Sequence, residues 1–132
     1  MTREEILKEI EQTLGLVPSF LKNIPDEYLE DEWGMLKRIE LSETHIPGKY
    51  KELMGLALSA ATKCIYCILF HTEMAKCQGA TDEEIEEAVH FAKHTAGWSA
   101  YVNGIQLDLD EFRRETLQIV EHMKAQAHKR AA

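Results

Sequence analysis

The chain has 132 residues, of which 45% are hydrophobic, and it contains only 3 prolines and 7 glycines. This length suits one domain, and this composition excludes an intrinsically disordered chain. The formal net charge of -8 argues against nucleic acid and anionic membrane surfaces as partners, because both repel an acidic protein.

The N-terminal third predicts two amphipathic helices. Thr2 and Glu5 have the spacing of a capping box, and a helical stripe of apolar residues follows until Gly15. Asp26 is a candidate cap for a second helix, which we expect to end near residues 42–45. The stripes consist of Ile6, Leu7, Ile10 and Leu14 in the first helix, and of Leu29, Trp33, Leu36 and Ile39 in the second.

The central part predicts two consecutive helices. Pro47 suits the first turn of a helix, and residues 50–61 are nearly all apolar or small, as in a helix that is covered on most sides. Thr62 is the expected cap of the next helix, which we place over residues 63–78.

The C-terminal part predicts two further helices. Thr81 and Glu84 have capping-box spacing, and the helix that they begin is expected to end at Gly97. Asp108 and Glu111 begin the last helix, whose basic C-terminal end suits the helix dipole. No segment shows the alternating pattern of a strand.

These elements predict an all-α, single-domain bundle of about six helices over residues 1–132. We expect a helical extension over about 1–45 and a core over about 46–124. The most apolar stretch, residues 54–70, contains Lys63 and is too short for a membrane span. The N-terminus lacks the basic and apolar regions of a secretory signal, so we expect a cytoplasmic protein.

Two of the three cysteines form a motif with chemical potential. Cys64 and Cys67 make a Cys-x-x-Cys near the start of a predicted helix, where backbone N–H groups and the helix dipole stabilise a thiolate. Residues three apart on a helix lie within reach of a disulfide. Cys77 lies ten residues further on, and we interpret it as a bystander thiol.

Two more side chains complete a candidate catalytic site. His71 follows Cys67 by four residues on the same helix face and is a candidate general base. Glu52 lies on an apolar helix, where a buried carboxylate needs a partner, and His71 is the candidate. We expect redox chemistry without metal or organic cofactor, because a second cysteine would capture an oxidised first one. Ordinary core cysteines, or a zinc site built from the same four residues, are the alternatives.

Glu52, the segment Cys64-Ile65-Tyr66-Cys67 and His71 together resemble the signature of the alkylhydroperoxidase D-like branch of the carboxymuconolactone decarboxylase family. The resemblance covers about residues 47–96. It implies an all-α fold that assembles into trimers or hexamers around a peroxide-reducing thiol site. It also implies that Cys67 attacks the peroxide, that Cys64 resolves the product, and that His71 and Glu52 relay protons.

The resemblance implies an alkylhydroperoxidase- or peroxiredoxin-type oxidoreductase that reduces hydroperoxides in antioxidant defence. An external dithiol of the lipoyl or thioredoxin kind would then reduce the enzyme again. Tyr66 stands where the best-known peroxidase members have a histidine, which leaves a general disulfide reductase open. Two other functions stay open as well: a lyase that decarboxylates a small lactone acid with Glu52 and His71, and a non-enzymatic metal-binding helical assembly.

Overall fold

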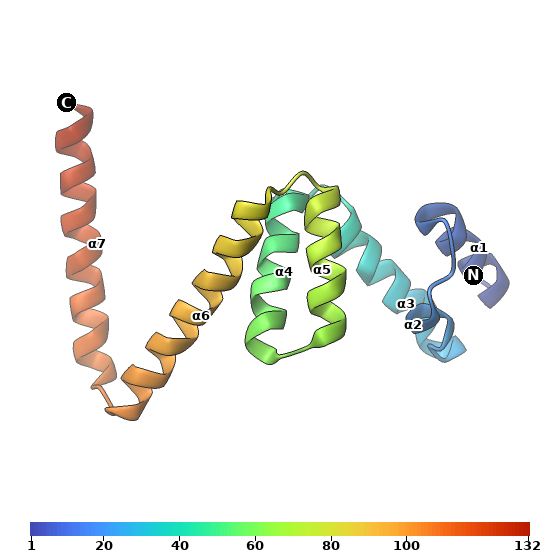
Figure 1. Ribbon diagram of the computed structural model, residues 1–132, viewed down its shortest axis with the longest axis horizontal. Helices are drawn as coiled ribbons and strands as arrows, with labels where there is room; N and C mark the ends of the chain where they lie inside the picture. The colour runs from blue at the N-terminus through green and yellow to red at the C-terminus, as the bar shows by residue number, and fades with distance from the viewer. The chain divides into compact units, whose positions relative to one another are not determined.

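The computed structural model describes residues 1–132, and every regular element in it is a helix, as predicted (Figure 1). The chain divides into two compact units, residues 1–89 and 90–132. In chain order the elements are α1 (Arg3–Leu14), α2 (Ser19–Lys22), α3 (Asp26–Leu36), the π-helical η1 (Lys37–Leu41), α4 (Gly48–Thr62), α5 (Ile65–Cys77), α6 (Asp82–Gly104) and α7 (Leu109–Ala131). The prediction of about six helices missed the four-residue α2 and the π-helical turn.

The first unit has its main hydrophobic core between α1, α2 and α3. The side chains at its centre are almost fully buried: Ile6, Ile10, Leu21, Leu29 and Trp33. Each such burial contributes about 1.5–3 kcal/mol. Arg3 links the start of α1 to the start of α3. Its guanidinium donates to the carbonyl of Ile24 at 3.0 Å and to the carboxylate of Asp26 at 2.6 Å.

The π-helical turn η1 links this core to α4. The Ser42 N–H donates to the Lys37 carbonyl at 2.9 Å, five residues back, which is the hydrogen bond of a π-helix. The Lys51 ammonium of α4 then donates to the carbonyls of Ile39 at 2.8 Å and Ser42 at 3.1 Å. Lys51 therefore holds the end of η1 beside α4.

Helices α4 and α5 form an antiparallel hairpin (Figure 1). The connection is only two residues long, and Lys63 adopts the left-handed conformation with φ of 59°. The prediction that Thr62 caps the helix over residues 63–78 is therefore wrong. Thr62 is the last residue of α4, and Cys64 is the N-cap of α5.

Other helix ends test the capping predictions. Both hydrogen bonds of the Thr2–Glu5 capping box are present, since each side chain accepts from the backbone N–H of the other residue. The Asp108 carboxylate accepts from the Glu111 N–H at 2.7 Å. Asp26 is not a cap: it is the first residue of α3, and Pro25 takes the N-cap position. Gly97 does not end its helix either, because α6 continues to Gly104.

The second unit consists of the end of α6 together with α7. Neither helix contains a buried residue. Large apolar side chains are exposed along both: Phe91, Trp98, Tyr101, Leu109, Leu117, Ile119 and Met123. No helix of the protein combines the length and apolar character that crossing a membrane requires.

Candidate active site

The α4–α5 hairpin carries all four predicted site residues. Glu52 lies in the second turn of α4. Cys64 is the N-cap of α5, and Cys67 and His71 lie in the first two turns of that helix. The helices run in opposite directions, so the start of α5 lies beside the end of α4. The seam between them has Glu52 opposite His71, and Ser59 opposite the cysteines.

Glu52 and His71 form a close pair across the seam. The Nδ1 atom of His71 lies 2.7 Å from Oε2 of Glu52. Glu52 is only 2% exposed, and the His71 side chain is 19% exposed. An ionised carboxylate only accepts hydrogen bonds, so Nδ1 carries a hydrogen and Nε2 has a free lone pair when the ring is neutral. This arrangement prepares Nε2 to accept a proton.

Gly55 makes room for this pair. A Cβ atom at position 55 would lie 2.6 Å from Cε1 and Nδ1 of the His71 ring and 2.8 Å from its Cγ. These distances are far shorter than van der Waals contacts, so any larger residue would displace the imidazole. The sequence pattern had indicated only that residues 50–61 are nearly all apolar or small.

The Cys64 sulfur occupies the N-cap position of α5. It accepts a hydrogen bond from the Cys67 N–H at 3.4 Å, and its own N–H donates to the Ser59 carbonyl at 3.0 Å. The Cys67 thiol and its backbone N–H lower the pKa of Cys64, because both donate to its sulfur. A thiolate at Cys64 is therefore stabilised by the helix N-terminus, as the sequence had indicated for one of the two sulfurs.

The Cys67 thiol has the opposite tendency. Its hydrogen bond to Cys64 raises its pKa, and so do desolvation and the negative charges of Cys64 and Glu40. The Ser59 hydroxyl acts against these influences and lowers the pKa. Both cysteines are free thiols, with Cys64 half-buried and Cys67 exposed.

The structure does not join His71 directly to the thiols. The hydrogen bonds of His71 include Glu52 but neither sulfur. His71 lies four residues after Cys67, which is about 6 Å along the axis of α5. Cys77 is exposed at the far end of α5, apart from the pair.

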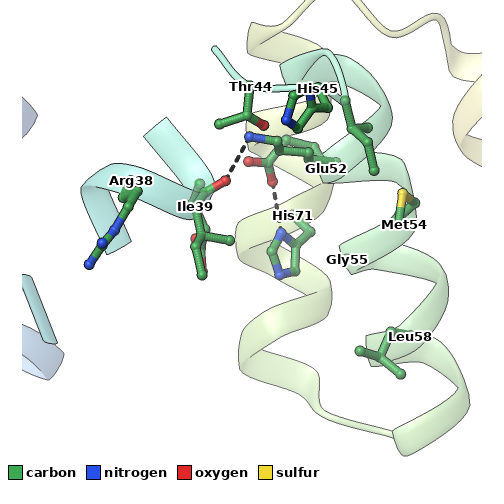
Figure 2. A pocket seen from close by; sticks show the side chains of 12 residues that line it. Arg38, Ile39, Thr44, His45, Glu52, Met54, Gly55, Leu58 and His71 are labelled. Carbon is green, nitrogen blue, oxygen red and sulfur yellow. Dashed lines mark hydrogen bonds and ion pairs between the residues drawn. The ribbon is translucent and has the colours of Figure 1, made fainter. Parts of the chain in front are cut away.

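A pocket of about 670 Å³ opens onto the Glu52–His71 pair, and Figure 2 shows the ring of His71 between α4 and the wall at Ile39. Its walls are mainly apolar and come from the end of η1, the following loop and α4. The side chains of this wall include Ile39, Ile46, Met54 and Leu58. The cysteines are not among its lining residues.

Ser59 and Glu40 lie near the thiols, and sequence reasoning did not connect either of them with the cysteines. Ser59 falls at helical spacing from Glu52, and its burial in an apolar helix was the available signal. Glu40 belongs to η1, and nothing local in the sequence connects it with Cys67. No three His, Cys, Asp or Glu side chains gather as a set of metal ligands, so the four residues proposed for zinc do not form a prearranged site.

Comparison with known proteins adds independent information. The sequence profile of the carboxymuconolactone decarboxylase family matches residues 30–108, which include the whole hairpin. Uncharacterized protein 4 in the cox locus of Paracoccus denitrificans is 28% identical over 75 residues, which is 57% of this chain and 68% of that protein.

The fold is also similar to a solved structure. The crystal structure of the alkylhydroperoxidase AhpD core from Rhodospirillum rubrum superposes with a TM-score of 0.73. The match covers 82% of each chain at 25% sequence identity.

Proposed function

Because this chain belongs to the carboxymuconolactone decarboxylase family, we propose that it is a thiol-dependent peroxidase of the alkylhydroperoxidase type. The observation that carries the proposal is the Glu52–His71 pair, buried one turn behind a dithiol at a helix N-terminus. The similarity to the alkylhydroperoxidase AhpD core supports the same chemistry. In this proposal Cys67, Cys64, His71 and Glu52 are the catalytic residues.

The two thiols take different roles in the proposed reaction. Cys67 is the exposed sulfur, which supports its role in attacking the peroxide. The lowered pKa of Cys64 makes Cys64 the more acidic of the two thiols. We therefore expect Cys64 to lose its proton first, through water to Nε2 of His71. The Cys67 proton then crosses the hydrogen bond between the sulfurs to Cys64.

The remaining steps conserve atoms and charge. The Cys67 thiolate attacks one peroxide oxygen, the O–O bond breaks, and the departing alkoxide takes the proton from His71. Cys67 is then a sulfenic acid. The Cys64 thiol condenses with it to a disulfide and releases water. An external dithiol, of the lipoyl or thioredoxin kind, reopens this disulfide by exchange.

Glu52 assists by electrostatics and orientation. Its carboxylate fixes the tautomer of His71 and stabilises the imidazolium that forms when Nε2 accepts a proton. A buried carboxylate strengthens this effect because the surroundings have a low dielectric constant.

The exposed apolar side chains of α6 and α7 support a further part of the proposal, which is assembly of the chain into a homo-oligomer, a trimer or hexamer. Monomeric proteins seldom expose so many large apolar side chains on consecutive helices. Sedimentation velocity at several protein concentrations measures the assembly directly, and a monomer at all of them would contradict it.

Two cysteine variants test the function. Cys67→Ser is expected to abolish hydroperoxide consumption, because no attacking sulfur is left. Cys64→Ser is expected to allow about one turnover and to leave a sulfenic acid that a dimedone probe traps. Cys77→Ser is the matched control and is expected to keep full activity. Multiple turnover by either of the first two variants would contradict the assigned roles.

A further inference from the structure

We propose that Lys51 is a specificity-determining residue: its ammonium holds the η1 wall of the pocket in place, and this wall favours hydroperoxides that carry a bulky apolar group. The inference rests on the proposed function and deepens it, since it assigns the pocket to one part of the substrate. Lys51 lines the pocket and precedes Glu52 in the chain, yet the proposed reaction gives it no role.

The direction of the proposed proton transfer places the substrate. His71 gives its proton to the departing alkoxide, so the oxygen that carries the organic group lies at the imidazole, and the outer oxygen faces Cys67. His71 lines the pocket, whereas the cysteines do not. The organic group of the substrate therefore extends into the pocket.

The pocket suits a large apolar group. Its volume is about 670 Å³, and the side chains of Ile39, Ile46, Met54 and Leu58 line it. These four residues are 41% to 67% exposed. Large apolar side chains that line a cavity and remain exposed are typical of a ligand site, because an apolar ligand removes their surface from water. Hydrogen peroxide, which has no organic group, cannot cover them.

Two hydrogen bonds from Lys51 fix the wall that η1 forms. The ammonium belongs to α4 and donates to the carbonyl of Ile39 at 2.8 Å and to that of Ser42 at 3.1 Å. No backbone N–H donates to either carbonyl, since both lie at the end of η1, where a helix leaves its last carbonyls unpaired. A lysine near a helix C-terminus is a suitable donor for such carbonyls.

These bonds determine the position of Ile39. Its carbonyl accepts from Lys51, and its side chain lines the pocket together with His71 (Figure 2). The wall continues beyond Ser42 as a loop without regular structure, over residues 43–47. Without the ammonium, the two carbonyls would turn to water and Ile39 would move away from α4. The pocket would then lose contact with the organic group of the substrate.

Three variants separate this role from a general effect on α4. Lys51→Leu removes the ammonium but keeps an aliphatic side chain that favours a helix. Lys51→Arg retains a cation that can donate to two carbonyls. Lys49→Leu is the matched control, because Lys49 also lies on α4 and pairs with Glu84 at 3.2 Å, and neither residue lines the pocket. Circular dichroism checks that each variant is folded.

The binding of cumyl alcohol, which is the product of cumene hydroperoxide reduction, tests the pocket without any peroxide. In the full chain labelled with [methyl-13C]methionine, NMR follows the Met54 signal in the pocket, and Met123 on α7 is the internal reference. We expect the dissociation constant of Lys51→Leu to be about tenfold higher than that of the wild type, since the two bonds that hold the wall are lost. Lys51→Arg should restore most of the affinity, and Lys49→Leu should bind as the wild type does.

Steady-state kinetics with two substrates connects the pocket with specificity. For Lys51→Leu we expect the KM for cumene hydroperoxide to rise about tenfold with little change in kcat. The kcat/KM for hydrogen peroxide should stay the same. An equal loss with both substrates would overturn the inference, because Lys51 would then support the chemical step and not the choice of substrate.

The binding experiment has its own decisive outcomes. Equal affinity of Lys51→Leu and the wild type for cumyl alcohol would overturn the inference, and so would a wild-type Met54 signal that does not move. An equally large loss in Lys49→Leu, or no recovery in Lys51→Arg, would also overturn it, because charge or packing on α4 would then be responsible. If binding follows the expectation while the wild-type protein consumes no hydroperoxide, the role of Lys51 in the pocket stands and the proposed function fails.

Discussion

Substitution of Gly55 by alanine perturbs the site at its tightest contact. The new Cβ would lie 2.6 Å from two atoms of the His71 ring, where an ordinary contact is about 3.5–4.0 Å. The ring must therefore move by about 1 Å. The Nδ1···Oε2 distance of 2.7 Å would then exceed the range of a good hydrogen bond, and Glu52 would lose its partner.

The size of the effect follows from two opposing contributions. Leaving a buried carboxylate without its partner destabilises a protein by about 3–5 kcal/mol, because its charge is then uncompensated. Replacing glycine by alanine inside a helix stabilises by about 1 kcal/mol. We therefore expect Gly55→Ala to lower the free energy of unfolding by about 2–4 kcal/mol and to slow hydroperoxide reduction at least tenfold.

Urea unfolding followed by circular dichroism, at fixed protein concentration, measures the first quantity, and a peroxide-consumption assay measures the second. Gly34→Ala is the matched control. Gly34 also lies inside a helix, α3, but a Cβ there meets nothing within 4 Å. This variant should be unchanged or stabilised by up to about 1 kcal/mol. If Gly55→Ala behaved like Gly34→Ala in both assays, the reasoning on the close approach of His71 would be refuted.

Three other substitutions have definite expected outcomes. Glu52→Gln keeps the shape of the side chain but removes its charge, so peroxide reduction at saturating substrate should fall about 100-fold; a change confined to KM would contradict the relay. Cys67→Ala removes the main hydrogen bond that lowers the pKa of Cys64, so Cys64 should titrate at higher pH in alkylation experiments; an unchanged titration would argue against coupling of the two thiols. Ile10→Ala opens a cavity in the fully buried core and should lower the unfolding free energy by about 2–5 kcal/mol in urea titrations, without loss of the Glu52–His71 pair.

Local sequence signals predicted most helices and the central pair of the site. Thr2 and Asp108 act as caps through hydrogen bonds that depend only on the next three residues, so their spacing alone was informative. The pairing of Glu52 with His71 was predicted from the cost of burying an unpaired carboxylate, and the structure brings the two together.

The features that sequence reasoning missed depend on packing between helices. Lys63 adopts a left-handed conformation because the short hairpin connection demands it, and the shift of the helix start from Thr62 to Cys64 follows. Gly97 stays helical because one glycine inside a helix costs only about 1 kcal/mol, which is too little to end it. The hydrogen bond from the Cys64 N–H to the Ser59 carbonyl forms only once α5 is packed against α4.

The central claim is that Cys64 and Cys67 form a disulfide as they reduce a peroxide. The most direct measurement is intact and peptide mass spectrometry of the protein after one equivalent of an organic hydroperoxide, with the alcohol product quantified in parallel. We expect the protein to lose two hydrogen atoms in a disulfide between these two cysteines, with one alcohol formed per chain. Cysteines that stay reduced, or alcohol formation without loss of the two thiols, would contradict the account.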